Sequence, residues 1–271
     1  MPELPEVETT CRGISPHITG KSFQKTIIRH HQLRWPIPDN LPQLLQGKKI
    51  LQVERRAKYL LIKTRQHTLI IHLGMSGSFY ITHPESVVEK HDHVDFIFDK
   101  NTCLRYTDPR RFGAILLTDQ PIDQHPLFTR LGPEPLGTDF NPEYLHQRSR
   151  NRKTAIKNFI MDAKVIAGVG NIYASESLFM AHIHPACAAG KISKKRYSDL
   201  VSAIQDVLQK AIKAGGTTLR DFVNGEKKPG YFSQQLQVYG RAGEPCPVCQ
   251  TTIKQLRQGQ RSSFYCPHCQ H

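Results

Sequence analysis

Four cysteines near the C-terminal end constrain the fold of this chain more than any other feature. They form two Cys-x-x-Cys pairs, Cys246 with Cys249 and Cys266 with Cys269, which sixteen residues separate. Each pair makes a tight turn that aims two sulfurs at one point, and two such turns on a hairpin complete a closed, structural zinc site. Two disulfides are the alternative, which the zinc-like spacing of the pairs and the lack of an export signal disfavour.

Composition indicates a polyanionic partner. The 271 residues include 37 lysines and arginines against 23 acidic residues, which gives a formal net charge of +14. Such an excess attracts nucleic acid first, since no long basic amphipathic helix argues for a membrane surface. The chain has no apolar run near the ~20 residues that cross a bilayer, and its start is acidic where a signal peptide is basic. We therefore expect a cytoplasmic protein that binds nucleic acid.

The chain divides into a strand-rich first part and a helical second part. Residues 23–118 hold eight strand-like runs, among them TLIIHL and HVDFIFD. They predict an antiparallel β-sandwich, and a short helix over roughly 5–14 is expected before it. A stretch rich in proline, glycine and aspartate at 121–142 indicates a linker. The runs AIKNFIMD and NIYASESLF then predict two helices around a glycine-rich turn, as in a helix-turn-helix element.

The longest helix is expected after this element. Its apolar residues recur at helical spacing from Tyr197 to Ile212, Ser193 suits its N-cap, and Gly215 and Gly216 suit its end. The apolar face is interpreted as core. The basic run of Lys194, Lys195 and Arg196 is interpreted as a solvated face of the same helix.

The first residues, MPELPEVE, carry groups suited to covalent chemistry. Removal of Met1 would expose the secondary amine of Pro2, which can attack an electrophilic carbon and give a cationic iminium. Glu3 and Glu6 are expected near that nitrogen, where a carboxyl group can move protons. Taken alone, the same residues are more typical of a frayed terminus with ordinary acids in a first helical turn.

Taken together, the motifs of the chain resemble those of formamidopyrimidine-DNA glycosylases, bacterial enzymes that remove oxidised purines from DNA. The resemblance rests on MPELPEVET, RRAKYLL, IHLGMSGS, YTDPRRFG, GVGNIYASE, GGTTLRDF and the terminal cysteines, in the same order over essentially the whole chain. It implies an N-terminal β-sandwich domain over 1–133, a helix-two-turn-helix domain over 134–233 and a zinc finger over 234–271. It also implies a monomer with one structural zinc ion and no redox or nucleotide cofactor.

The resemblance further implies a bifunctional DNA glycosylase and abasic-site lyase of base excision repair. Pro2 would attack C1′ of the damaged nucleoside and form a Schiff base, while Glu3 moves protons. Lys58 matches the family residue assigned to β-elimination, and Arg261 matches the zinc-finger arginine assigned to δ-elimination. Without the resemblance, Lys58 is a solvated cation that interrupts a strand, and Arg261 is a simple phosphate contact.

An enzyme that acts at C1′ must extrude the nucleotide and fill the hole left in the stack. In the family, the positions that match Met75, Arg110 and Phe112 fill it, although by sequence alone residues such as Met75 and Phe112 more often belong to a core. Candidates for DNA binding by resemblance or by charge are His91, Arg110, Arg111, Arg152, Lys157, Asn171 and Arg261. The residues assigned to the lesion pocket are Glu6, Thr217, Thr218 and Arg220.

Several rival functions remain open at this point. An endonuclease VIII-like glycosylase would prefer oxidised pyrimidines, but Leu4 and Val7 in PELPEV favour the purine-directed branch. A tautomerase that uses Pro2 as a base leaves the zinc finger and the charge unexplained. A non-catalytic lesion-binding protein leaves the match at Pro2, Glu3 and Lys58 unexplained.

A second metal site at His91 and His93 lacks a clear further ligand set.

Overall fold

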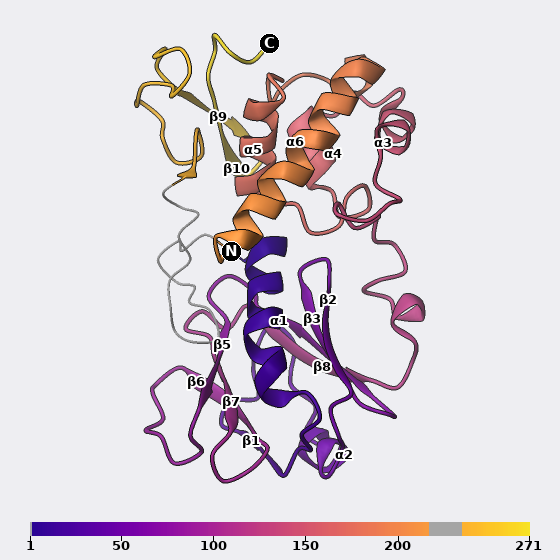
Figure 1. Ribbon diagram of the computed structural model, residues 1–271, viewed down its shortest axis with the longest axis vertical. Coiled ribbons are helices and arrows are strands. Elements are labelled where there is room, and N and C mark those ends of the chain that lie inside the picture. Colours follow the sequence, from indigo (N-terminus) through magenta and orange to yellow (C-terminus); the bar gives the residue numbers. More distant parts are fainter. Residues whose placement is uncertain (1, 217–234) are drawn as a thin grey trace. The chain divides into compact units, whose positions relative to one another are not determined.

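The computed structural model describes residues 2–216 and 235–271. Three residues expected in the lesion pocket, Thr217, Thr218 and Arg220, therefore lie outside the described residues. The described chain forms two compact units (Figure 1): unit 1 holds 2–129 and 212–216, and unit 2 holds 130–211 and 235–271. None of the helices in the described ranges combines the length and the apolar character that a membrane span requires.

Unit 1 is built on two antiparallel four-stranded sheets, and all eight predicted strands are confirmed. The first sheet has the order β1-β6-β7-β5 and the second has the order β2-β3-β4-β8. The strands of the first sheet are β1 (Lys25–Ile28), β5 (Ser78–Thr82), β6 (Asp92–Ile97) and β7 (Cys103–Thr107). Those of the second are β2 (Gln52–Arg56), β3 (Tyr59–Lys63), β4 (Thr68–His72) and β8 (Ala114–Thr118).

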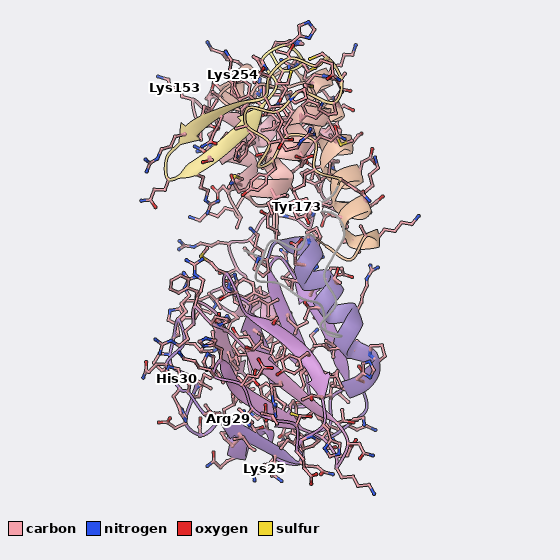
Figure 2. All side chains as sticks on the ribbon, turned by 90° about the vertical axis from the view of Figure 1, so that its left-hand side faces the viewer. Lys25, Arg29, His30, Lys153, Tyr173 and Lys254 are labelled. Carbon is pink, nitrogen blue, oxygen red and sulfur yellow. The ribbon has the colours of Figure 1, made fainter. Side chains whose placement is uncertain are left out.

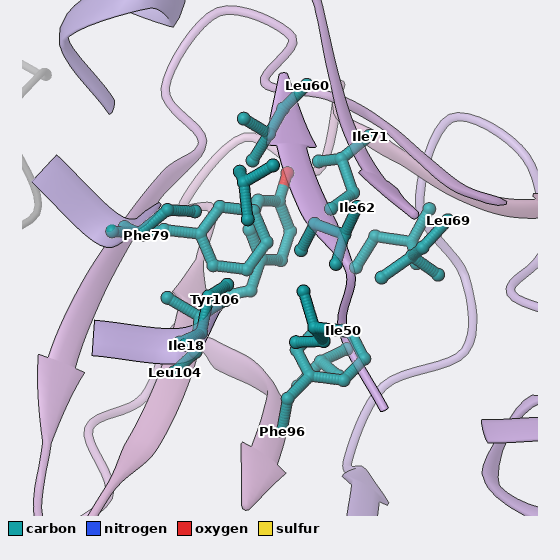
Figure 3. Packing of buried hydrophobic residues seen from close by; sticks show 14 of the residues in the cluster. Ile18, Ile50, Leu60, Ile62, Leu69, Ile71, Phe79, Phe96, Leu104 and Tyr106 are labelled. Carbon is teal, nitrogen blue, oxygen red and sulfur yellow. The ribbon is translucent and has the colours of Figure 1, made fainter. Parts of the chain in front are cut away.

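The two sheets enclose one hydrophobic core (Figure 3). Leu60 and Ile62 of β3 share a cluster with Leu104 and Tyr106 of β7. These residues stand two apart along their strands, so their side chains point to the same face of each sheet. The Phe79 ring of β5 packs on the Tyr106 ring with their centroids 5.0 Å apart. The predicted β-sandwich is therefore confirmed.

Helix α1 (Leu4–Ile18) packs against β2 and β3 of one sheet and β5 of the other. Strands β2 and β5 are edge strands, so α1 covers one open side of the sandwich. The helix is longer than the predicted 5–14, because Pro16 removes a backbone hydrogen bond but does not end it. The last turn is fixed by Ile18, which is fully buried. A second helix, α2 (Leu41–Leu45), is too short to produce a helical period in the sequence.

Unit 2 is helical and ends in a hairpin. Its helices are α3 (Pro142–Ser149), α4 (Ile156–Met161), α5 (Asn171–Met180) and all but the last two residues of α6 (Lys194–Lys213). Its strands are β9 (Lys254–Gln258) and β10 (Arg261–Tyr265). Short 3₁₀ turns are η1 (Ile122–Gln124), which belongs to unit 1, and η2 (Ala189–Lys191). The caps of α6 are as predicted: Ser193 Oγ accepts the Arg196 N–H at 3.3 Å, and Gly215 and Gly216 have φ of +79° and +81°.

Candidate active site and nucleic-acid interface

The start of α1 places two carboxylates beside Pro2. Glu3 is the N-cap residue, and Glu6 Oε2 accepts the backbone N–H of Glu3 at 2.8 Å in a capping box. Both carboxylates are only 2% exposed, and Pro2 is also buried. The orientation of Glu6 is therefore fixed by the fold.

Gly216 lies against the Glu6 carboxylate. A Cβ built on Gly216 would stand 3.2 Å from Glu6 Oε1, and the φ of this glycine is +81°. A side chain at this position would be strained and crowded at once. Of the expected lesion-pocket residues, Glu6 is the one that the structure describes, and it contacts the residue that precedes Thr217 in the sequence.

Lys58 occupies a two-residue turn between β2 and β3, where Arg56 pairs with Tyr59. The preceding Ala57 has φ of +54°. Arg55 fixes this turn to α1, because its Nε donates to Glu8 Oε2 at 3.0 Å and its Nη1 donates to the Ala57 carbonyl at 3.0 Å. Lys58 is half-buried and does not interrupt a strand, contrary to the alternative that sequence alone left open. The turn places it beside the first half of α1.

His72, at the end of β4, is a candidate that sequence reasoning missed. Burial, with the positive charges of Lys58 and Arg34, lowers its pKa to about 4. Its Nδ1 accepts the Gly74 N–H at 3.0 Å, so the ring is neutral and carries its proton on Nε2. A pocket of about 290 Å³ is lined by Arg34, His72, Gly74, Met75 and Phe112.

The candidate stack-filling residues lie on two loops of unit 1. Met75 is half-buried on the loop between β4 and β5, whereas Arg110 and Phe112 are exposed between β7 and β8. Phe112 is 47% exposed, and the Arg110 guanidinium lies 5.1 Å from the centre of its ring. Phe112 is therefore not a core residue, which answers the question that its sequence context left open.

A basic pocket of about 400 Å³ adjoins the second loop. Arg29, His30, Lys90, His91 and Arg111 supply its basic lining, with Glu89 and Asp92 also present. Figure 2 labels Arg29 and His30 among the side chains of unit 1. Arg111 Nη1 lies 2.7 Å from His30 Nε2, and Arg111 has φ of +56°. In the described ranges His91 and His93 join no metal-binding cluster, so the second metal site gains no support.

Unit 2 positions the other DNA-binding candidates differently. Arg152 is exposed between α3 and α4. Asn171 begins α5, where its Nδ2 lies 3.5 Å from the Tyr239 hydroxyl. Among the residues that the structure describes, its buried Oδ1 has no hydrogen-bond partner. Lys157 departs from expectation because it is only 1% exposed. Its Nζ donates to the Ser262 carbonyl and to Ser263 Oγ, both at 2.9 Å, so it joins α4 to β10.

Glu176 of α5 is a second residue that sequence reasoning missed. Its carboxylate accepts the backbone N–H groups of Gln237, Val238 and Tyr239 at 2.8, 3.0 and 2.8 Å. Burial raises the pKa of this carboxyl, while the three donors oppose the shift. The contact anchors the segment that leads into the C-terminal hairpin.

The four cysteines meet the requirements of one zinc ion. Their Sγ atoms all lie within 4.8 Å of one another, with 3.9 Å between Cys246 and Cys269 and 3.4 Å between Cys249 and Cys266. The N–H groups of Val248 and Cys269 point at Sγ of Cys246 and Cys266, at 3.4 Å each. Backbone donors stabilise thiolates in this way. The β9–β10 hairpin beside the cysteines carries Arg261, which is exposed.

The fold and the site define a zinc-finger protein with an N-terminal β-sandwich, a helical second unit and buried acids beside an N-terminal proline. Three family models match the chain in this order. They are the formamidopyrimidine-DNA glycosylase N-terminal domain over residues 1–115, the formamidopyrimidine-DNA glycosylase H2TH domain over 131–223, and the zinc finger found in FPG and IleRS over 243–271.

Individual relatives agree along the full length. The formamidopyrimidine-DNA glycosylase of Hahella chejuensis is 55% identical over 270 residues, with 100% of both chains covered. A Lactococcus lactis FPG mutant in complex with a Fapy-dG containing DNA is 33% identical with a TM-score of 0.92, again over 100% of both chains. The wild-type Lactococcus lactis protein with an oxidized pyrimidine containing DNA is 32% identical with a TM-score of 0.91, over 100% of both. This chain belongs to the formamidopyrimidine-DNA glycosylase family.

Proposed function

We propose that this protein is a bifunctional DNA glycosylase and abasic-site lyase, which excises 8-oxoguanine and formamidopyrimidines from duplex DNA. It acts as a monomer in the bacterial cytoplasm, where it serves base excision repair. The observation that carries the proposal is the buried arrangement of Pro2, Glu3 and Glu6 at the start of α1. An N-terminal secondary amine beside two fixed carboxyl groups has the parts that covalent catalysis with proton transfer needs.

The first chemical step is attack by the Pro2 amine, freed by removal of Met1, on C1′ of the damaged nucleoside. The C1′–base bond breaks, the base leaves with its electron pair, and a proton from Glu3 completes its departure. The sugar ring then opens: the C1′–O4′ bond breaks, the proton of the attacking amine passes to O4′, and an iminium joins Pro2 to C1′. Glu6 is bound to the Glu3 N–H, so it positions the backbone from which Glu3 acts. This division of labour assigns proton transfer to Glu3 and positioning to Glu6.

The second step is strand cleavage. The positive iminium withdraws electrons and acidifies the C2′ hydrogen, so its removal expels the 3′ phosphate. Lys58 assists this β-elimination from its fixed turn, and Arg261 assists δ-elimination of the 5′ phosphate. A structural zinc ion holds the hairpin that presents Arg261 and takes no part in either elimination.

DNA recognition divides between the two units. In unit 1, Met75 and Phe112 fill the hole left by the extruded nucleotide, while Arg110 bonds the orphaned cytosine. His91 and Arg111 bind phosphate from the same unit. In unit 2, Arg152 and Asn171 supply phosphate contacts. Lys157 supports the zinc-finger hairpin through its bonds to Ser262 and Ser263.

Borohydride trapping tests the covalent step. The protein is incubated with duplex DNA that carries 8-oxoguanine opposite cytosine, the mixture is reduced, and the crosslinked peptide is mapped by mass spectrometry. We expect an adduct on residue 2. We expect no adduct on residue 2 in Pro2→Leu, because a bulky second residue keeps Met1 in place and leaves no free amine at that position. Tight binding of the duplex without an adduct, in protein whose mass shows that Met1 is gone, contradicts the nucleophile and leaves a lesion-binding protein.

Oxidised pyrimidines form the second candidate substrate class. The Lactococcus lactis relative has been captured with such DNA. The same trapping assay with matched duplexes, which differ only in the lesion, decides between them. Faster single-turnover excision of the oxidised purine supports the primary proposal, and faster excision of the oxidised pyrimidine reverses it.

A further inference from the structure

Asp108 is a fully buried carboxylate that the proposed chemistry does not use. It lies between β7 and the exposed loop of Arg110 and Phe112. Its Oδ1 accepts the Ser76 hydroxyl at 2.6 Å. Its Oδ2 accepts the Gly113 N–H at 2.8 Å and the Tyr106 hydroxyl at 3.1 Å. The carboxylate thus bonds the residue directly after Met75 and the residue directly after Phe112.

Two further bonds tighten this connection. Ser76 Oγ accepts the Arg110 N–H at 3.1 Å, so one hydroxyl joins both loops. The carbonyl of Asp108 accepts the Arg111 N–H at 3.1 Å, which closes the tight turn of the second loop. The acceptors of both bonds, Ser76 Oγ and the Asp108 carbonyl, belong to the same network.

The two loops also pack backbone against backbone. A Cβ built on Gly74 would stand 2.3 Å from the Phe112 carbonyl carbon, and one built on Gly113 would stand 1.8 Å from the Tyr106 hydroxyl. No side chain fits at either glycine without moving backbone or the buried tyrosine. The separation of the loops is therefore fixed by direct contact, and Asp108 holds that contact closed.

We propose that Asp108 is a positioning residue that makes Met75, Arg110 and Phe112 one rigid wedge. The inference rests on the proposed function, since it assigns these three side chains to the hole in the duplex. A wedge held in place before DNA arrives avoids the entropy cost of ordering two loops on binding. A buried carboxylate is costly unless its bonds are satisfied, and here three donors satisfy it.

The test compares a substrate that needs the wedge with one that does not. Duplex DNA with 8-oxoguanine opposite cytosine needs nucleotide extrusion, whereas a single-stranded oligonucleotide with an abasic site has no stack to fill. For Asp108→Ala we expect kcat/KM on the duplex to fall about 100-fold through misplacement of the wedge. Cleavage of the single strand should stay within about twofold of the unchanged protein, because the Pro2 chemistry does not involve the wedge.

Graded variants and a matched control separate positioning from stability. Asp108→Asn keeps one acceptor oxygen and should lose less than Asp108→Ala. Ser76→Ala removes one hydrogen bond to the Asp108 carboxylate, and kcat/KM should fall by up to about tenfold on the duplex only. The control is Asp95→Asn, because Asp95 is also fully buried and its ion-pair partners, Arg105 at 2.7 Å and Arg29 at 2.6 Å, are not residues of the wedge. The loss of stability in Asp95→Asn should lower cleavage of both substrates by the same factor.

Fluorescence of 2-aminopurine beside the lesion reports wedge insertion directly. At saturating protein, we expect a smaller fluorescence change for Asp108→Ala than for the unchanged protein or Asp95→Asn. Equal losses on duplex and single strand, or an unchanged ratio, overturn the role of Asp108 and leave the proposed function intact. An unchanged protein that cleaves neither substrate overturns the proposed function and the inference with it.

Discussion

At the scale of single residues, His72 makes the Met75 loop sensitive to pH. Its Nδ1 accepts the Gly74 N–H, which a doubly protonated ring cannot do. Burial, with Lys58 and Arg34 nearby, lowers its pKa to about 4, whereas a histidine in the unfolded chain titrates near ~6.5. The unfolded state therefore binds the proton first as pH falls. The contribution of His72 to stability is complete above about pH 6.5 and is lost toward pH 4.

His72→Gln should reduce this loss, because glutamine does not titrate. We expect the free energy of unfolding of the unchanged protein to fall more than that of the variant between about pH 7.5 and about pH 5. Urea unfolding at the two pH values measures both. The other histidines are the same in the two proteins and cancel in the comparison. Equal falls contradict the assignment of the low pKa to this ring.

Sequence predicts those site residues whose role depends on chain neighbours. Pro2, Glu3 and Glu6 are predicted as site residues because they lie within five positions of one another at the start of a helix, so sequence alone brings them together. His72 and Asp108 are not, because their roles depend on contacts with distant strands and loops. Asp108 reads as an ordinary turn acid before Pro109, and only the folded chain shows that it bonds Ser76, 32 residues away.

At the scale of elements, the first turn of α1 contributes both to the stability of the fold and to the reaction of Pro2. Glu6→Ala removes the acceptor of the Glu3 N–H, which should cost about 1 kcal/mol, as for other helix caps. The same change frees the backbone beside Pro2 and should slow formation of the borohydride-trapped adduct. Glu6→Gln retains an acceptor and is the matched control. Thermal unfolding and trapping rates measure the two effects, and an unchanged trapping rate in Glu6→Ala contradicts the positioning role.

Helices and strands could be predicted from the sequence where their apolar residues form a clear pattern over enough positions. The eight strands form apolar runs of strand length, several of which alternate, and α6 has helical spacing. In contrast, α2 has one turn of helix with Leu41 and Leu45 as its buried residues. The position of Lys157 was not predictable, because lysine is usually exposed. Its partners lie on β10, 105 and 106 residues further along the chain.

The C-terminal hairpin depends on its metal. The small core around it contains Val238 and Ile253 together with Cys246 and Cys266, so two of the zinc ligands are also core residues. Metal binding therefore supplies much of its folding free energy. A strong chelator should release one zinc per chain and abolish duplex binding, as a metallochromic dye and fluorescence anisotropy will show. The single tryptophan, Trp35, lies in unit 1, and its emission should not change.

At the scale of the whole molecule, the net charge of +14 is not spread over equivalent residues. Some cations are used within the protein: Lys194 Nζ lies 2.6 Å from Glu143 Oε1, and Arg196 donates to the carbonyls of His182 and His271. Others, such as Arg152 and Lys195, are exposed. Net charge alone therefore overstates the number of phosphates that the protein neutralises.

The salt dependence of DNA binding distinguishes phosphate contacts from background charge. Each neutralised phosphate contributes ~0.9 to the slope of log K against log salt concentration, so Arg152→Ala should lower the slope by about that amount. Lys195→Ala removes the same charge from the solvated face of α6 and should leave the slope unchanged. Anisotropy titrations of lesion-containing and undamaged duplexes over a range of salt measure both variants. The Arg152 effect should be equal on the two duplexes, because phosphate contacts carry no information about the base. Equal changes in both variants would mean that the charge acts as a diffuse field, and Arg152 would then lose its place in the interface.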